Sequence, residues 1–159
     1  MGLFRRHPYV TLVTVLLAGG ALFVAWSVRR NAARRLTPER LEAARALWDR
    51  KGPKDYRLTY TILRGGAGEA DEYQVRVKNG EAVEATINGR DAEKGALGAY
   101  GMDRLFDFIE RFFRVDADRS KEKAHYVADF DDEDGHLIWY YRHVPGTRES
   151  VTIEVRSLE

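Results

Sequence analysis

The chain has 159 residues, a formal net charge of +1 and no cysteine, which excludes disulfides, thiolate metal sites and thiol catalysis. The charge is unevenly distributed: residues 1–35 hold six of the 26 basic residues and none of the 25 acidic ones, so 20 stand against 25 in the rest, a formal charge of −5. Because nucleic-acid binding needs a basic footprint, this acidic remainder argues against a nucleic-acid partner.

An uncharged run of 21 residues extends from Pro8 to Val28. As a helix it would be about 31 Å long, which matches a hydrocarbon core of about 30 Å. The sequence therefore predicts a short basic tail over 1–7, a transmembrane helix over 8–28, a basic juxtamembrane linker over 29–37 and a soluble domain over 38–159. A cleaved signal peptide is the alternative, but its apolar stretch is usually about 7–15 residues long, and Ala25-Trp26-Ser27 is a poor cleavage site.

Amphipathic aromatic rings favour the headgroup level of a bilayer, and arginines there can contact anionic lipids. The residues expected at the membrane interface are Tyr9, Trp26, Arg29, Arg30, Arg34 and Arg35. The lipid bilayer is thus the first expected partner. The orientation stays open, because the arginines after the run favour a cytoplasmic domain, whereas a short tail with Arg5 and Arg6 resembles the start of an export signal.

Beyond the linker, Thr37-Pro38 is typical of a helix start, and apolar residues at helical spacing predict a helix over 38–51 that Gly52-Pro53 ends. Three strands with alternating apolar residues follow over 56–62, 72–78 and 83–87. Asn79-Gly80 predicts a tight hairpin between the last two, since both residues tolerate positive φ.

Four glycines and several charges predict a loop over 88–101. An apolar stripe then predicts a helix over 103–113, a charged loop occupies 117–123, and three more strands are expected over 125–131, 136–144 and 150–156. The element order is α-βββ-α-βββ. This order predicts an α+β domain whose antiparallel sheet is packed by helices on one face.

Metal chemistry finds little support in the sequence. The acidic run from Asp129 to Asp134 precedes Gly135, but an EF-hand frame on this glycine would place Phe130 at the first ligand position and Tyr141 at the last. His136 and His143 are an odd number of residues apart on one predicted strand, so they are expected on opposite faces. We therefore predict no metal site and no cofactor.

Aromatic residues over 137–143 are the clearest candidate for a binding surface. Alternation assigns one face of this strand to Leu137, Trp139, Tyr141 and His143, and the other to Ile138, Tyr140 and Arg142. Because both faces are largely apolar, the strand is expected to be central in the sheet. The aromatic face can belong to the core, or Trp139, Tyr141 and His143 can line a groove for a protein segment, a lipid or a small apolar ligand. Its polar edge could include Arg57, Arg76 and Arg142.

Two other functions remain as alternatives. An enzyme could use a dispersed carboxylate site on the fourth and fifth strands, with Asp129 and Asp131 as a pair at the same strand parity. A structural subunit of a membrane assembly could use Gly19-Gly20 for close helix contact. No nucleophile elbow or phosphate-binding loop occurs. We therefore expect a single-pass, non-catalytic binding or interaction module at the membrane surface.

A family resemblance rests on a few local patterns: the helix ending in Trp48, Asp55-Tyr56, the hairpin over 73–81, Leu105-Phe106-Asp107, and Phe130-Asp131 with Asp134-Gly135. Over about residues 40–156 the chain resembles a family of uncharacterised small bacterial domains found in exported or membrane-anchored proteins. Many members carry a cysteine pair where this chain has Leu63-Arg64-Gly65-Gly66. The resemblance implies no activity and no catalytic residues, and it favours an extracytoplasmic domain.

Overall fold

The computed structural model describes residues 34–66, 68–117 and 123–159, and from Leu36 onward they form one compact unit. Among these residues, no helix combines the length and the apolar character needed to cross a bilayer. The predicted span over 8–28, together with Tyr9, Trp26, Arg29 and Arg30, lies outside the described residues. Of the arginines expected at the interface, Arg34 is half-buried and Arg35 is exposed.

Helix α2 (Pro38–Lys51) has the predicted bounds. The hydroxyl oxygen of Thr37 accepts a hydrogen bond from the backbone N–H of Arg40 at 3.3 Å, and proline occupies the first turn. At the other end, the N–H of Gly52 donates to the carbonyl of Trp48 at 2.7 Å. The sequence signals for the start and the end of this helix are therefore confirmed.

The next three strands are β1 (Tyr56–Arg64), β2 (Asp71–Lys78) and β3 (Glu81–Ile87), and they form an antiparallel meander. Asn79 and Gly80 have φ values of 51° and 79°, as the predicted hairpin requires. The predicted loop over 88–101 is wrong in part, because it contains the short strand β4 (Arg90–Asp91) and the 3-10 helix η1 (Lys94–Ala99).

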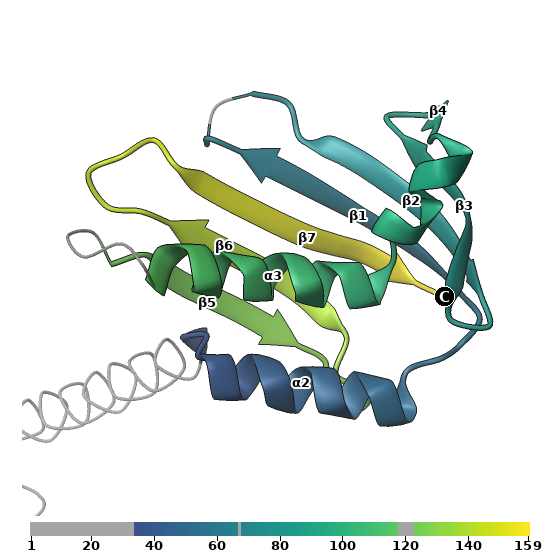
Figure 1. The fold of residues 1–159 in the computed structure, drawn as a ribbon, viewed down its shortest axis with the longest axis horizontal. Helices are drawn as coiled ribbons and strands as arrows, with labels where there is room; N and C mark the ends of the chain where they lie inside the picture. The colour runs from purple at the N-terminus through teal and green to yellow at the C-terminus, as the bar shows by residue number, and fades with distance from the viewer. Residues whose placement is uncertain (1–33, 67, 118–122) are drawn as a thin grey trace, which may run out of the picture. The chain divides into compact units, whose positions relative to one another are not determined.

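The second half consists of α3 (Met102–Ala117), β5 (His125–Phe130), β6 (Leu137–His143) and β7 (Ser150–Leu158). The strands form a seven-stranded antiparallel sheet in the order β4-β3-β2-β1-β7-β6-β5, with β1 and β7 paired at its centre (Figure 1). The predicted α+β class and antiparallel sheet are confirmed. The predicted central position of β6 is wrong, because β6 is next to the edge strand β5.

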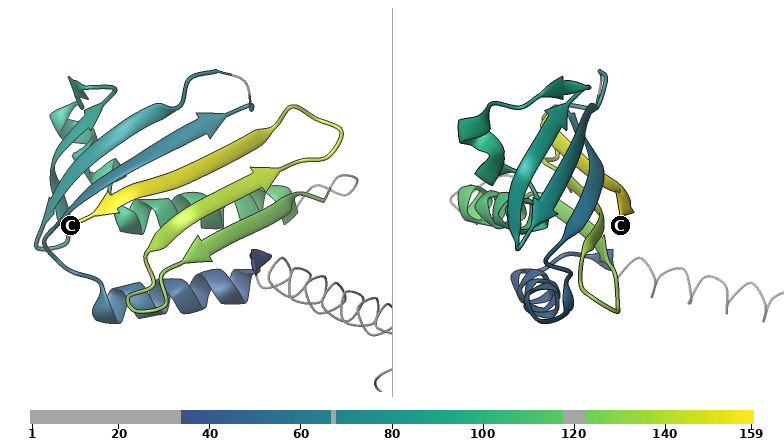
Figure 2. Two further views of the ribbon diagram at one scale, coloured as in Figure 1. Left: turned by 180° about the vertical axis from the view of Figure 1, so that it is seen from behind. Right: turned by 90° about the vertical axis from the view of Figure 1, so that its right-hand side faces the viewer.

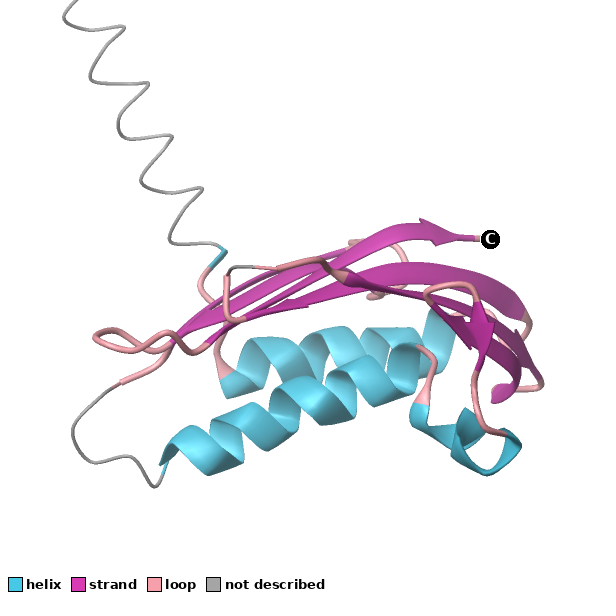
Figure 3. Ribbon diagram, turned by 90° about the horizontal axis from the view of Figure 1, so that it is seen from above, coloured by secondary structure: helices cyan, strands magenta, loops and turns pink. Residues whose placement is uncertain are grey.

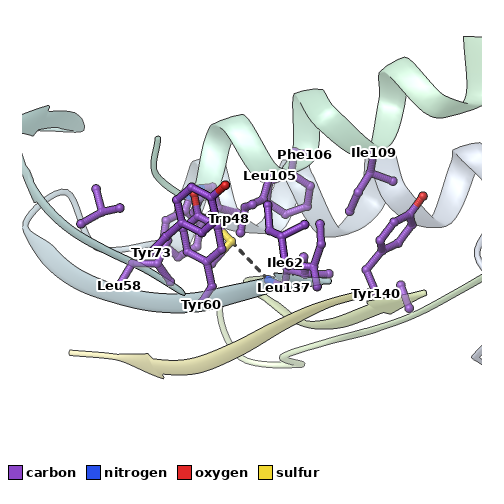
Figure 4. Packing of buried hydrophobic residues seen from close by; sticks show 14 of the residues in the cluster. Trp48, Leu58, Tyr60, Ile62, Tyr73, Leu105, Phe106, Ile109, Leu137 and Tyr140 are labelled. Carbon is purple, nitrogen blue, oxygen red and sulfur yellow. Dashed lines mark hydrogen bonds between the residues drawn. The ribbon is translucent and has the colours of Figure 1, made fainter. Parts of the chain in front are cut away.

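Both long helices pack on one face of the sheet, and the opposite face lies open (Figures 2 and 3). The core forms between this covered face and the helices, and includes Leu58, Tyr60, Phe106 and Ile109 (Figure 4). Inward residues alternate along the strands, as the sequence predicts. We call the face turned away from α2 and α3 the open face.

A β-bulge in β6 changes which residues share a face. Phe130 of β5 pairs with Leu137, but Asp129 pairs with Trp139, so Ile138 is an extra residue on β6. Leu137 is therefore turned inward and fully buried, and its N–H donates to the sulfur of Met102 at 3.4 Å (Figure 4). The prediction that Leu137 shares a face with Trp139 is wrong for this reason.

Strand β5 is an edge strand whose outward carbonyls have partners. The carbonyl of Tyr126 accepts the N–H of Leu36 at 3.0 Å, and the carbonyl of Ala128 accepts Arg40 Nη1 at 3.1 Å. Because unpaired strand edges invite pairing with other chains, these two bonds protect the edge. Residues just before α2 and within its first turn thus cover the edge of the sheet at β5.

Candidate functional site

Trp139, Tyr141 and His143 form a row along β6 on the open face, which we call the aromatic row. Tyr140 and Arg142, which alternate with them, are fully buried on the covered face. Within the aromatic row the rings stack, with centroids 6.1 Å apart between the first two and 6.3 Å apart between the last two. All three side chains are half-buried. The sequence prediction that they share a face holds, but the face is an open surface.

The residues that flank the aromatic row on β5 and β7 are acidic at one end of the row and uncharged next to it. Trp139 pairs with Asp129 on β5 and with Glu154 on β7, so two acidic positions flank the indole. Next along the strand, Tyr141 pairs with Val127 and Thr152. A carboxylate on each side of a tryptophan suits a cationic group, because the ring face and both acids attract positive charge.

At the far end of the aromatic row, His143 pairs with His125 on β5 and with Ser150 on β7. Sequence parity separates His143 from His136 but gives no sign that His125 lies opposite. The signal that could have found this neighbour is the hairpin itself, because the Asp131–His136 turn sets the register of β5 and β6.

The arginines proposed for the polar edge do not gather there. Arg57 and Arg76 pair with each other across β1 and β2, on the part of the sheet away from β6. Arg142 is buried on the covered face, where its Nε and Nη2 atoms lie 2.7 and 2.6 Å from the carboxylate oxygens of Asp116. Its guanidinium also lies 4.5 Å from the centroid of the Phe112 ring.

Two groups in this buried cluster have pKa values shifted by their surroundings. The hydrogen bonds to Asp116 raise the pKa of the Arg142 guanidinium, so it stays charged. Burial, followed by the hydrogen bond to Asp116, raises the pKa of Tyr126. Because Asp116 lies in the last turn of α3 and Arg142 lies on β6, the cluster fastens the end of the helix to the sheet.

The carboxylates proposed as a catalytic pair have different surroundings. Asp129 lies in β5 opposite Trp139, whereas Asp131 has left the strand. One oxygen of Asp131 accepts the N–H groups of Glu133 and Asp134, at 2.8 and 3.2 Å, and the first of these bonds is the main cause that lowers the pKa of Asp131. Asp131 therefore stabilises a turn.

A group of potential metal ligands does occur at this turn. One ligand atom from each of Asp131, Asp134 and His136 lies within 4.8 Å of the others. However, Asp134 Oδ1 already contacts Nδ1 of His136 at 2.6 Å, and Lys51 lines the same hollow, where its charge opposes a cation. The close spacing of Asp131, Asp134 and His136 in the sequence could have indicated this group of ligands. The EF-hand pattern tested on the sequence does not contain that spacing.

A groove between the two long helices was not foreseen from the sequence. Its volume is about 480 Å³, and its apolar walls are Pro38 and Leu41 from α2 with Phe113 and Ala117 from α3. Both sets are spaced three or four residues apart, so each lies on one face of its helix. The groove depends on how the helices lie against each other, which neither helix pattern specifies alone.

Comparison with known proteins identifies one family: a model described as a family of unknown function (DUF6174) matches residues 40–131. The matched part runs from the first turn of α2 to the end of β5, and it includes α3 and the first four strands. No curated protein and no solved structure matches the chain.

Proposed function

The chain belongs to this family of unknown function, whose description assigns no activity, and we propose that it is a single-pass, membrane-anchored binding module without catalysis. Its binding surface is the open face around the aromatic row, and its ligand is a protein partner that presents basic side chains. The observation that carries the proposal is the stacked aromatic row on the sheet face opposite α2 and α3.

The residue types of the aromatic row support an interaction role. Tryptophan and tyrosine offer large amphipathic surfaces at low entropic cost, and they are enriched among residues that dominate binding energy in protein interfaces. In an antiparallel sheet with one solvated face, polar residues are expected there. Trp139 and Tyr141 depart from that expectation side by side, and Val127 extends the apolar surface to the neighbouring strand.

Charge favours a basic partner. Asp129 and Glu154 flank Trp139, and residues 36–159 carry a formal charge of −5. A lysine or arginine over the indole ring would gain about 0.5–1 kcal/mol at an exposed site from the ring alone. Complementary charge also speeds association and disfavours acidic competitors.

Anchoring is supported by the uncharged run over 8–28, and we propose that the domain lies on the extracytoplasmic side, as the family resemblance favours. A tether confines the open face near the bilayer. For a short flexible linker the effective concentration of a membrane-bound partner is on the order of millimolar. A modest patch such as the aromatic row is then sufficient for useful occupancy.

Site-specific photocrosslinking in intact cells tests this proposal. A benzophenone amino acid at Thr152, next to Tyr141 on the open face, should form a discrete adduct with a basic protein. The same residue at Ala46, exposed on α2, should not form that adduct. Replacing Tyr141 with alanine should reduce the adduct at least fivefold, because it removes the centre of the aromatic row.

A charge control separates recognition from general effects. Glu154→Lys should abolish the adduct, because it places a positive charge where a basic side chain binds. Gln74→Lys also introduces a lysine, on β2 and away from the aromatic row, and should leave the adduct intact. Equal adducts from Ala46 and Thr152, or an adduct made of a second copy of this chain, would overturn the proposal.

A further inference from the structure

The second half of α3 carries apolar residues that the core does not cover. Its fully buried residues, Met102, Leu105, Phe106 and Ile109, all lie in the first half. In the second half, Phe113 is half-buried, and Val115 exposes 47% of its surface. This half of α3 runs beside the first turns of α2 (Figure 1). Its side chains form one wall of the groove described above.

The volume and lining of the groove suit an apolar chain with a polar end. About 480 Å³ lies within the usual range of about 300–1,000 Å³ for small-molecule sites, and the walls are mainly apolar. The charged rim is balanced: Arg45 lies 3.3 Å from Glu110, while Glu42 and Arg114 stand on opposite helices. An amphipathic molecule without a net charge fits this pattern best.

The position of the groove along the chain indicates where such a molecule would come from. Pro38, which lines the groove, is ten residues after Val28, the last residue of the uncharged run. Ten extended residues span at most about 36 Å. A groove held that close to a bilayer has phospholipid as its most abundant amphipathic neighbour.

We propose that the groove between α2 and α3 receives an acyl chain of a zwitterionic phospholipid from the bilayer that anchors the protein. This inference rests on the membrane anchoring proposed above and is independent of the open face. The acyl chain lies against Leu41 and Phe113, and the headgroup lies at the charged rim. Lipid bound there would hold the helix layer of the domain at the membrane surface.

Photolabelling of the full chain in vesicles tests this. The vesicles contain phosphatidylethanolamine and phosphatidylglycerol at 3:1, with about 1% of the phosphatidylethanolamine carrying a mid-chain diazirine. Peptide mass spectrometry should find adducts within 38–45 or 110–117, in addition to adducts within 8–28. A diazirine fatty acid of the same length should label these two segments at background level only.

Two matched variants identify the groove as the labelled site. Ala117→Trp places an indole in the groove and should reduce labelling of 38–45 and 110–117 at least fivefold. Val115→Trp adds the same side chain to the same helix, at a position that does not line the groove, and should leave that labelling unchanged. Labelling within 8–28 should be equal in both variants.

The outcomes distinguish failure of the groove from failure of the anchor. Adducts confined to 8–28, or groove adducts that survive Ala117→Trp, would overturn the lipid site while the anchor stands. Absence of adducts from 8–28 would overturn the anchor itself. Stronger labelling by the fatty acid than by the phospholipid would overturn the assignment of the ligand.

Discussion

Two buried tyrosines differ in whether their hydroxyl group has a hydrogen-bond partner. The Tyr56 hydroxyl accepts the backbone N–H of Met102 at 3.0 Å, which satisfies a donor at the start of α3. Among the described residues, the hydroxyl of Tyr140 has no hydrogen-bond partner, although the side chain is fully buried. Burial raises the pKa of both phenols, so both remain neutral.

Replacement by phenylalanine should therefore have opposite effects at the two positions. Tyr56→Phe leaves the Met102 N–H unpaired and should lower the free energy of unfolding by about 1–3 kcal/mol. Tyr140→Phe removes a polar atom without a partner and should leave the stability unchanged or raise it. Urea unfolding of the full chain in detergent, followed by circular dichroism, measures both. A large loss from Tyr140→Phe would contradict this interpretation.

Residue patterns foretold local structure well wherever the cause was local. Thr37-Pro38 and Asn79-Gly80 specify a cap and a turn through their own backbone preferences, and both are found. Leu137 was assigned to the wrong face because alternation assumes a regular strand, and the extra residue at Ile138 breaks it. A bulge of this kind is visible only in the pairing of two strands.

At the scale of elements, the turn between β5 and β6 is fitted tightly against α2. Gly135 has φ of 84°, and a Cβ there would lie 2.9 Å from the backbone nitrogen of Trp48 and closer still to the carbonyl oxygen of Ala44. Gly80 in the β2–β3 hairpin has a similar φ of 79° but nothing within 4 Å. A side chain at Gly80 would therefore meet backbone strain only, whereas a side chain at Gly135 would meet backbone strain and a steric clash with α2.

Alanine at these two positions should reveal that difference. Gly80→Ala should cost about 1–2 kcal/mol, since only the left-handed backbone opposes it. Gly135→Ala should cost at least about 3 kcal/mol, because α2 must also move away from the turn. Denaturant unfolding of the full chain in detergent gives both values. Equal losses would show that the contact with α2 is not rigid.

The elements missed from the sequence had weak or ambiguous signals. Strand β4 has only two residues, too few for any alternation to show. The turn before β4 nevertheless has a sequence signal, because Asn88-Gly89 is the same type of pair that predicts the β2–β3 turn. In the structure, Asn88 and Gly89 have φ values of 52° and 74°. The candidate groove could not be predicted at all, because it arises where α2 and α3 meet across a long stretch of chain.

At the scale of the whole molecule, α2 with β1–β4 and α3 with β5–β7 are two halves that join through β1 and β7 into a single sheet. Order along the chain predicted the two layers, because helices with one apolar stripe must cover a sheet with one apolar face. It did not predict that β6 is next to the edge, since strand order depends on pairings between distant segments. The aromatic row therefore lies near one side of the open face.

The proposed membrane anchor leads to a prediction about the whole molecule. The full chain should remain in the membrane pellet after alkaline extraction and enter solution only with detergent. Leu16→Arg combined with Leu17→Arg should release it, because each arginine at the centre of a span costs about 2.5–3.5 kcal/mol. Leu16→Phe with Leu17→Phe should not. A C-terminal reporter should report the extracytoplasmic compartment, and an uncut full chain in the soluble fraction would contradict the anchor.

The two hydrogen bonds at the edge of β5 affect how the domain would respond to a pulling force. Leu36 and Arg40 donate hydrogen bonds to the carbonyls of Tyr126 and Ala128, and they lie at the end of the linker that is expected to lead to the bilayer and just after it. Tension between membrane and domain would therefore load these two bonds before it reached the rest of the fold. Their rupture would uncover the edge of β5, which could then pair with a strand of another chain.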